Sequence, residues 1–340
     1  MGLAGGSQAP KKESIMTIDK LLGIDYPIIV APMFLISNTK MVKAAITNGV
    51  TAAFPALNYR TEEELRSAIK DIKAVSDKPF GVNLIVNKSN PKYRRQLEIL
   101  LELRVPFIIT SLGNPREVIQ RAHAVGIKVF CDVTDLNYAR KVEALGADAL
   151  VAVNSRAGGH AGSIPPKELV TLLKENCSIP IISAGGVGTS GQVKEALDWG
   201  AAGVQVGTVF IASAESEISP EYKQALIDYG ENDIVRTTKL SGSPLTVINT
   251  PAVKEMGTKA NWLEWILNNN RTLKNWAKML LAYKGMNLIR KSALGATYKN
   301  IWCAGPAIEY VHKVRPMKEI IEDLTSGLTR NEKPETRNLA

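Results

Sequence analysis

The chain has 340 residues, of which 45% are hydrophobic and 22% are charged, a balance that excludes disordered, collagen-like and coiled-coil classes. No run approaches about 18 uninterrupted apolar residues, which excludes a membrane-spanning helix, and the three cysteines (Cys131, Cys177 and Cys303) are too far apart and odd in number for a disulfide framework. With a formal net charge of +9, the chain is predicted to be a soluble protein of a reducing, cytoplasmic compartment.

Regular structure is predicted to begin at residue 16, after a loose tail of residues 1–15 that lacks the apolar core of a signal peptide. Eight short apolar runs then follow: Pro27–Ala31, Thr51–Ala56, Phe80–Val86, Phe107–Leu112, Lys128–Val133, Ala149–Val153, Pro180–Ala184 and Gly203–Gly207. Each run is apolar on both faces, as parallel strands buried on both sides are.

Segments of helical composition separate these runs, among them Thr61–Val75, Pro115–Val125, Asn137–Leu145 and Gly191–Trp199. Thr61 followed by Glu64 has the spacing of a capping box, which predicts a helix start. Eight strand–helix units over residues 16–230 predict a (β/α)8 TIM barrel in the α/β class. A doubly wound sheet is disfavoured because no glycine-rich fingerprint follows the first run.

After about residue 230 this alternation ends. Residues 241–244 (Ser-Gly-Ser-Pro) predict a loop, and a basic stretch follows from Lys254 to Lys299 with nine Lys or Arg residues against two acids. We interpret residues 231–325 as a smaller, mostly helical, basic C-terminal appendage that ends in a closing helix near Met317–Leu324. Residues 326–340 are predicted to be a polar tail.

The role of the basic stretch stays open at this point. Its apolar residues from Leu273 to Leu281 recur with the spacing of one helical stripe, which favours a helix with a solvated basic face. The alternatives are contact with an anionic substrate or dinucleotide, or with nucleic acid or a membrane surface. We favour the first interpretation and expect neither nucleic acid nor a membrane as a partner.

The loops at the carboxyl ends of the barrel strands should build the active site. The seventh run is followed by Gly185 and Gly186, and the eighth ends Gln205-Val206-Gly207-Thr208. Glycine lets the main chain approach phosphate oxygens closely, and the Thr208 hydroxyl adds a donor. These two loops predict a phosphate site, with ordinary barrel turns as the alternative.

His160 lies in a glycine-rich segment, Gly158-Gly159-His160-Ala161-Gly162, after the sixth run. A flexible loop at the rim of the site would let its imidazole act as a general base or donate a hydrogen bond to an anion. His160 is therefore the predicted catalytic residue, whereas His123 and His312 are predicted to be structural. No His or Cys spacing indicates a metal site, and no GxSxG supports a hydrolase triad.

Two further strand ends could contact a flat ring. Asn83 ends the third run, and its amide can donate to and accept from the edge of a heterocycle; the alternative is a buried amide satisfied by the backbone. Ala31, Pro32 and Met33 follow the first run, where they could supply a backbone N–H group and an apolar wall.

Taken together, Ala31–Met33, Phe80–Asn83, Ala157–Gly162, Ser183–Gly186 and Gly203–Thr208 resemble the nitronate monooxygenase (2-nitropropane dioxygenase) family, a relative of the flavin-dependent enoyl-ACP reductases. The resemblance covers most of residues 16–325. It implies a TIM barrel with non-covalently bound FMN, His160 as the catalytic histidine, and a homodimer. The residues that it implies at the cofactor are Ala31, Pro32, Met33, Asn83, Gly158, Gly185, Gly186, Gln205, Val206, Gly207 and Thr208.

The activity that the resemblance implies is oxidation of alkyl nitronates with O2 to a carbonyl compound and nitrite. Two alternatives stay open: an NAD(P)H-dependent FMN reductase of quinones or enoyl thioesters, and a phosphate-binding barrel without redox chemistry. Three positions depart from the family pattern, namely Val153, Arg156 and Pro306. Arg156 stands where many relatives have an acid, so it adds positive charge at the rim and favours an anionic small-molecule substrate.

Overall fold

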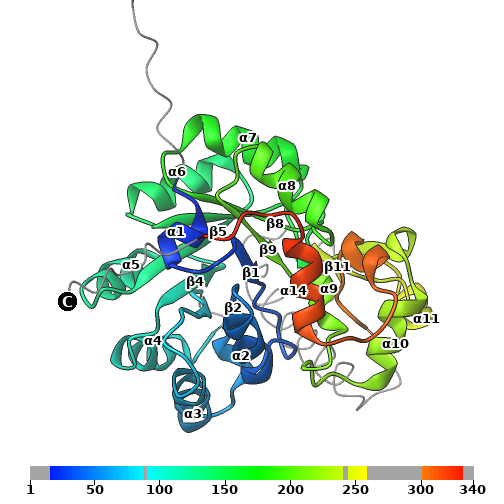
Figure 1. Cartoon of the computed structure of the whole chain (residues 1–340), viewed down its shortest axis with the longest axis horizontal. Helices are drawn as coiled ribbons and strands as arrows, with labels where there is room; N and C mark the ends of the chain where they lie inside the picture. Colours follow the sequence, from blue (N-terminus) through cyan, green and yellow to red (C-terminus); the bar gives the residue numbers. More distant parts are fainter. Residues whose placement is uncertain (1–15, 88–89, 240–243, 259–300, 332–340) are drawn as a thin grey trace, which may run out of the picture.

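A closed barrel of eight parallel strands forms the centre of the molecule (Figure 1). This computed structural model describes residues 16–87, 90–239, 244–258 and 301–331. The barrel strands are β1 (Ile28–Val30), β2 (Thr51–Pro55), β3 (Gly81–Ile85), β4 (Phe107–Ser111), β5 (Lys128–Val133), β6 (Ala149–Val153), β8 (Ile181–Ala184) and β9 (Gly203–Val206). Each pairs in parallel with the next, and β1 closes the ring on β9. The predicted TIM barrel is confirmed, with one barrel strand in each predicted run.

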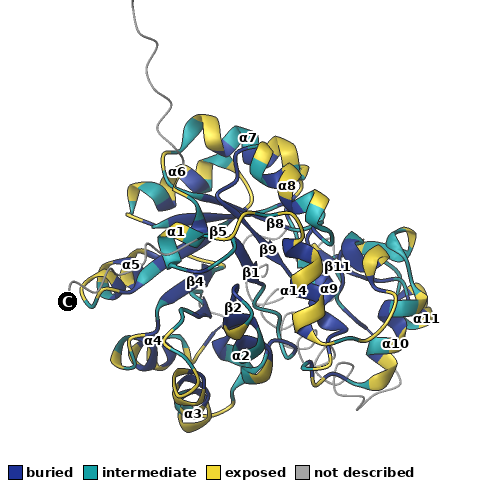
Figure 2. Cartoon of the chain, viewed as in Figure 1, coloured by how far each residue is buried: buried dark blue, intermediate teal, exposed yellow. Residues whose placement is uncertain are grey.

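Helices cover the outside of the barrel, with their inner faces buried and their outer faces exposed (Figure 2). Those of the first seven units are α2 (Thr39–Thr47), α3 (Glu62–Lys73), α4 (Tyr93–Glu102), α5 (Arg116–His123), α6 (Leu136–Ala144), α7 (Pro166–Asn176) and α8 (Ser190–Asp198). The predicted capping box is present at α3: the Thr61 hydroxyl accepts from the backbone of Glu64 (3.1 Å), and the Glu64 carboxylate accepts from the backbone of Thr61 (3.3 Å).

Replacing this cap should weaken the fold measurably. Thr61→Ala removes the acceptor for the Glu64 N–H group, so we expect the free energy of unfolding to fall by about 1 kcal/mol. Urea unfolding followed by circular dichroism measures this change. Thr61→Ser keeps a hydroxyl acceptor and is the control; an equal loss in both variants would contradict the capping role.

Alternation along the strands separates an inner from an outer core. Val129 and Cys131 of β5 pack with the helices, whereas Phe130 between them packs inside the barrel and stacks on Phe107 at 4.9 Å. Helix α1 (Ile18–Leu22) packs its apolar side chains on this inner cluster, and the backbone of Ile18 donates to Ala202 O at 2.8 Å. Because α1 covers the end where the strands begin, a ligand site belongs at the carboxyl ends.

The last outer helix, α14 (Met317–Thr325), comes from the far end of the chain and packs against both α2 and α8. The predicted closing helix is therefore confirmed, and it completes the ring of outer helices. Between β9 and α14 the chain forms α9 (Thr208–Ile211), α10 (Pro220–Asp228), η2 (Glu231–Asp233), β10 (Ile234–Thr237), β11 (Leu245–Ile248), α11 (Pro251–Met256) and η3 (Pro306–Tyr310).

A second, three-stranded antiparallel sheet lies beside the barrel in the order β10-β11-β7, where β7 is Gly159–His160. The sequence pattern did not predict these strands within the appendage. The predicted tail 1–15, most of the 241–244 loop, residues 259–300 of the basic stretch and residues 332–340 lie outside the described residues. The appendage boundaries at 231 and 325 stay predictions. Within the described ranges, no helix has the length and apolar character needed to cross a membrane.

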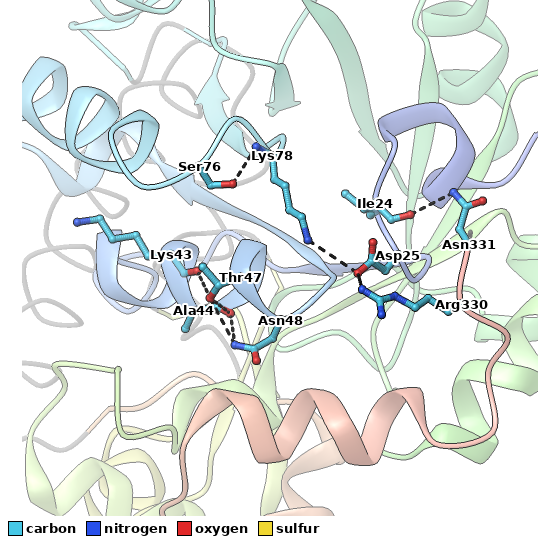
Figure 3. A network of polar contacts seen from close by, with 10 residues as sticks. All are labelled: Ile24, Asp25, Lys43, Ala44, Thr47, Asn48, Ser76, Lys78, Arg330 and Asn331. Carbon is cyan, nitrogen blue, oxygen red and sulfur yellow. Dashed lines mark hydrogen bonds and ion pairs between the residues drawn. The ribbon is translucent and has the colours of Figure 1, made fainter. Parts of the chain in front are cut away.

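The end of the described chain is fastened near the first barrel strand (Figure 3). The backbone of Asn331 donates to Asp25 O at 2.8 Å, and its side-chain amide donates to Ile24 O at 3.2 Å. The Arg330 guanidinium lies 2.7 Å from the Asp25 carboxylate, and Lys78 lies 3.8 Å from the same oxygen. The segment after α14 thus binds to the residues that precede β1, close to the start of the described chain.

Candidate active site

Four polar side chains face the barrel axis near the carboxyl ends of their strands: Asn83, Ser111, Asp132 and Gln205. Their orientation follows from alternation, because the residues that flank them, such as Val204 and Val206 beside Gln205, pack in the outer core. Beneath them the inner core is apolar, formed by side chains such as Ile109, Phe130, Val151 and Ile182. A polar layer on an apolar core marks this end of the barrel as a ligand site.

Three of these side chains form one hydrogen-bonded chain. The Asn83 amide donates to Ile109 O (3.1 Å) and to the Ser111 hydroxyl (2.7 Å), and the Ser111 hydroxyl donates to Asp132. Burial raises the pKa of Asp132 to about 6, against the opposing effect of the Ser111 hydrogen bond. Asp132 Oδ1 and Gln205 Oε1 are buried, and neither has a hydrogen-bond partner in the described part of the chain. Such orphaned oxygens are expected where a ligand completes the site.

The loop after β8 needs its two glycines. Gly185 and Gly186 have φ angles of +118° and +82°, where other residues are strained. A Cβ atom at Gly185 would lie 2.5 Å from the backbone nitrogen of Ala157, and one at Gly186 would lie 2.9 Å from Cβ of Arg156. The loops after β6 and β8 therefore pack main chain against main chain, with no room for a side chain.

Asn154 holds these two loops together, a role that the sequence analysis missed. It is fully buried; its amide donates to Gly185 O (3.0 Å) and accepts from the backbone of Arg156 (2.9 Å). Its own carbonyl accepts from the backbone of Gly162 at 3.2 Å. The signal in the sequence is a lone amide directly after the uniformly apolar run of β6.

Gly158 and Thr208 meet at the segment that precedes η3. A Cβ atom at Gly158 would lie 2.8 Å from the backbone nitrogen of Gly305, and that nitrogen donates to the Thr208 hydroxyl at 3.0 Å. The hydroxyl is thus an acceptor here, and its own proton is left to donate. The loop after β6, the start of α9 and the 301–305 segment therefore converge at this point.

The residues after β1 lie beside Gly207. A Cβ atom at Gly207 would lie 3.4 Å from Sδ of Met33 and 3.5 Å from Cβ of Ala31. The backbone N–H prediction for this segment is wrong: Ala31 donates to Val206 O (2.8 Å), Met33 donates to the Ser37 hydroxyl (2.9 Å), and a proline has no N–H group. Only the apolar wall stays available here.

Val206 differs from its predicted neighbours in orientation. Its side chain is 1% exposed and packs in the outer core with the helices, while the Gln205 side chain points to the axis. The Val206 carbonyl accepts from the backbone of Ala31, so this residue shapes the strand and its side chain cannot contact a ligand on the axis.

His160 is held by a strand and does not lie in the flexible loop that the sequence predicted. Gly159 and His160 form β7, in which His160 pairs with Leu245 of β11. The Arg236 guanidinium of β10 donates to Gly162 O at 2.7 Å and fixes the segment that follows. Desolvation lowers the pKa of His160 below 6.5. The imidazole is therefore neutral at pH 7 and can accept a proton.

The three departures from the family pattern have clear surroundings. The Arg156 guanidinium makes a bidentate ion pair with Glu231 (2.8 and 3.0 Å), so its predicted excess charge at the rim is compensated. Val153 packs on the inner core, and Pro306 begins η3.

The other two histidines lie elsewhere: His123 forms a hydrogen bond with Asp148 at 2.8 Å, and His312 is exposed. Among the described residues no cluster of His, Cys, Asp or Glu could hold a metal ion.

Comparison with known proteins places the chain in one family. A family model described as nitronate monooxygenase matches residues 16–93 and 86–327. A nitronate monooxygenase of Pseudomonas aeruginosa is 32% identical over 253 residues, which cover 61% of this chain and 72% of that protein.

Two further relatives are similar over more of the chain. The (3aS,4S,5R,7aS)-5-hydroxy-7a-methyl-1-oxo-octahydro-1H-indene-4-carboxyl-CoA dehydrogenase of Mycobacterium tuberculosis is 30% identical over 267 residues, 77% of this chain and 74% of that protein. The solved structure of FabK from Thermotoga maritima matches with a TM-score of 0.79 and 28% identity, over 92% of this chain and 96% of that one. The FabK structure therefore shares the fold of this chain.

Proposed function

The chain belongs to the nitronate monooxygenase family, whose members are oxidoreductases, and from this we propose that it is an FMN-dependent nitronate monooxygenase. Its substrate would be an alkyl nitronate, which it would oxidise with O2 to a carbonyl compound and nitrite. The observation that carries the proposal is the pairing of a glycine cradle, Gly185-Gly186, with an inward polar layer in which Asp132 Oδ1 and Gln205 Oε1 have no partner among the described residues.

The residues fit FMN in two ways. The positive φ angles of Gly185 and Gly186 and the absence of a side chain at Gly207, with the Thr208 hydroxyl free to donate, suit a phosphate group. The orphaned Asp132 and Gln205 oxygens of the polar layer suit the hydrogen-bond donors at the edge of a flat ring, while Asn83, whose amide donates to Ile109 O and Ser111, supports the layer. Ala31, Pro32, Met33 and Gly158 would form the surrounding walls. Bound FMN would supply the electron acceptor that the side chains lack.

His160 would accept a proton from the substrate or donate a hydrogen bond to it. Because its lowered pKa keeps the ring neutral, it can accept the α-proton of a neutral nitroalkane, or donate one N–H to the nitro group of a nitronate. The pairing of β7 with β11 would hold the ring in a single place while the substrate binds. Positioning of the substrate is thus assigned to the small sheet, and positioning of the cofactor to the barrel.

A second function is favoured by one observation, the similarity to a carboxyl-CoA dehydrogenase. In that case the chain would be an NAD(P)H-dependent FMN reductase that acts on an enoyl thioester or a quinone. The cofactor site would be the same, and the electron donor would differ. His160 would then assist protonation of the product.

The visible spectrum of the purified protein with added FMN tests the proposal. We expect the two absorption bands of bound oxidised flavin, no rapid bleaching by NADH or NADPH without oxygen, and oxygen uptake that depends on an alkyl nitronate. Rapid anaerobic bleaching would favour the reductase instead. A protein that stays colourless after incubation with FMN would leave a phosphate-binding barrel without redox chemistry.

A further inference from the structure

Asp132 carries a carboxyl group that the proposed mechanism leaves unused, on the inner face of the barrel. It is the penultimate residue of β5, and its neighbours Cys131 and Val133 pack in the outer core. One of its oxygens accepts from Ser111, and the other is buried and has no partner among the described residues. A carboxylate in this position is costly unless something in the site compensates it.

The surroundings of Asp132 leave its charge unbalanced. The adjacent strands β4 and β6 carry no ionisable side chain. Tyr138 of α6 and Cys131 of β5 interact electrostatically with Asp132. Burial raises the pKa of each to about 12, so both are neutral near pH 7. Arg116 and Glu117 at the start of α5 are exposed to solvent. With no compensating charge among the described residues named here, we assign that role to a proton or to the ligand itself.

We propose that Asp132 exchanges a proton in step with reduction of the bound flavin: it is ionised beside the oxidised ring and protonated beside the reduced, negatively charged ring. This inference rests on the proposed function because it needs FMN in the barrel. When a two-electron donor such as dithionite is oxidised, its two electrons pass to the flavin and two protons are taken up from solution, one on the flavin and the other on the Asp132 carboxylate. Asn83 and Ser111 would orient the carboxyl group and set the pH range of the exchange.

The physical reason is the energy of like charges in a site with little water. Reduction places negative charge on the ring, so an ionised Asp132 nearby opposes reduction and a neutral one does not. The raised pKa of Asp132, about 6, makes its protonation accessible near neutral pH. The exchange therefore links the reduction potential to pH through a residue of this chain.

Titration of the FMN-loaded protein with dithionite against a reference dye, from pH 5 to pH 8.5, tests the inference. At pH 8 we expect the equilibrium constant for reduction to be about tenfold larger in Asp132→Asn than in the wild type, which is about 30 mV for a two-electron couple. At pH 5, where Asp132 is protonated, the two should agree. In Ser111→Ala the Asp132 carboxylate loses its hydrogen-bond donor, so its pKa rises. As the pH is lowered, the potential of this variant should therefore reach that of Asp132→Asn at a higher pH than the wild type does.

Asp135→Asn is the matched control, because it removes the same charge at the exposed N-cap of α6 and keeps a capping side chain. Its potential should follow the wild type. Equal potentials in the wild type and Asp132→Asn at every pH overturn this inference and leave the proposed function standing. A wild-type chain that binds no FMN overturns both.

The wild type also gives a readout of its own, should Asp132→Asn fail to fold or to hold FMN. The slope of its potential against pH reports the protons taken up per two electrons. More than one proton between about pH 6 and pH 7 supports the exchange at Asp132. One proton throughout that range overturns it.

Discussion

His160→Ala is expected to lower the turnover of a neutral nitroalkane by about 10²- to 10⁴-fold, the usual contribution of a general base. FMN should stay bound, because His160 lies on β7 and contributes nothing to the cradle at Gly185. With a preformed nitronate the proton is already gone, so only a hydrogen bond is lost, and the rate should fall about tenfold. Oxygen uptake with each substrate, together with the flavin spectrum, measures the three effects.

The reaction rate should also depend on pH in a defined direction. Because desolvation lowers the pKa of His160 below 6.5, its proton-accepting form persists into mildly acidic solution, and the rate should fall only below that pKa. His312→Ala changes an exposed histidine outside the site and should leave both the rate and the pH profile unchanged. A His160→Ala enzyme with full activity on the nitroalkane would remove His160 from the mechanism.

Gly185→Ala is expected to have the second-largest effect, on cofactor binding. The residue has a φ angle of +118°, and an added Cβ would lie 2.5 Å from the Ala157 backbone and 2.6 Å from the Asn154 amide oxygen. The strain of about 1–3 kcal/mol must be relieved by moving one loop away from the other. We therefore expect the dissociation constant for FMN to rise by about 5- to 100-fold. Quenching of flavin fluorescence measures it.

A matched glycine separates backbone strain from the loss of close packing. Gly126 has a φ angle of +78° with no atom within 4 Å of an added Cβ, and it lies at the end of α5 away from the cradle. Gly126→Ala should lower the melting temperature slightly and leave FMN affinity unchanged. Equal affinities for FMN in the two variants would show that the contacts of Gly185 do not matter for binding.

The barrel could be predicted because its strands are buried on both faces. Runs such as Ala149–Val153 need no partner to be recognised, and their spacing fixes the number of units. The small sheet could not be predicted in the same way. β7 contributes two residues, Gly159 and His160, and pairs with Leu245 and Thr246, which lie some 85 positions further along the chain. Pairing at that separation depends on tertiary packing, which propensity does not report.

The site residues also fall into those that a local sequence pattern predicts and those whose roles depend on tertiary contacts. The glycines after β8 could be located because positive φ angles and close approach restrict the residue type. The roles of Asn154 and Asp132 depend on hydrogen bonds between neighbouring strands, which no local pattern specifies. A signal was present for Asp132, since a charged residue within a doubly buried strand is rare. The pairing of Arg156 with Glu231 joins loops 75 positions apart and could not be foreseen.

The late position of α14 in the chain affects how the protein is made. Its apolar residues, including Met317 and Ile321, cover α2 and α8, and residues 207–316 must be translated between the last barrel strand and this helix. At about 5–20 residues per second, a ribosome needs roughly 5–20 s for that interval. During that time α2 and α8 lack the cover that α14 gives them, so apolar surface of the nascent barrel stays exposed to solvent longer than in a barrel whose eighth helix follows directly.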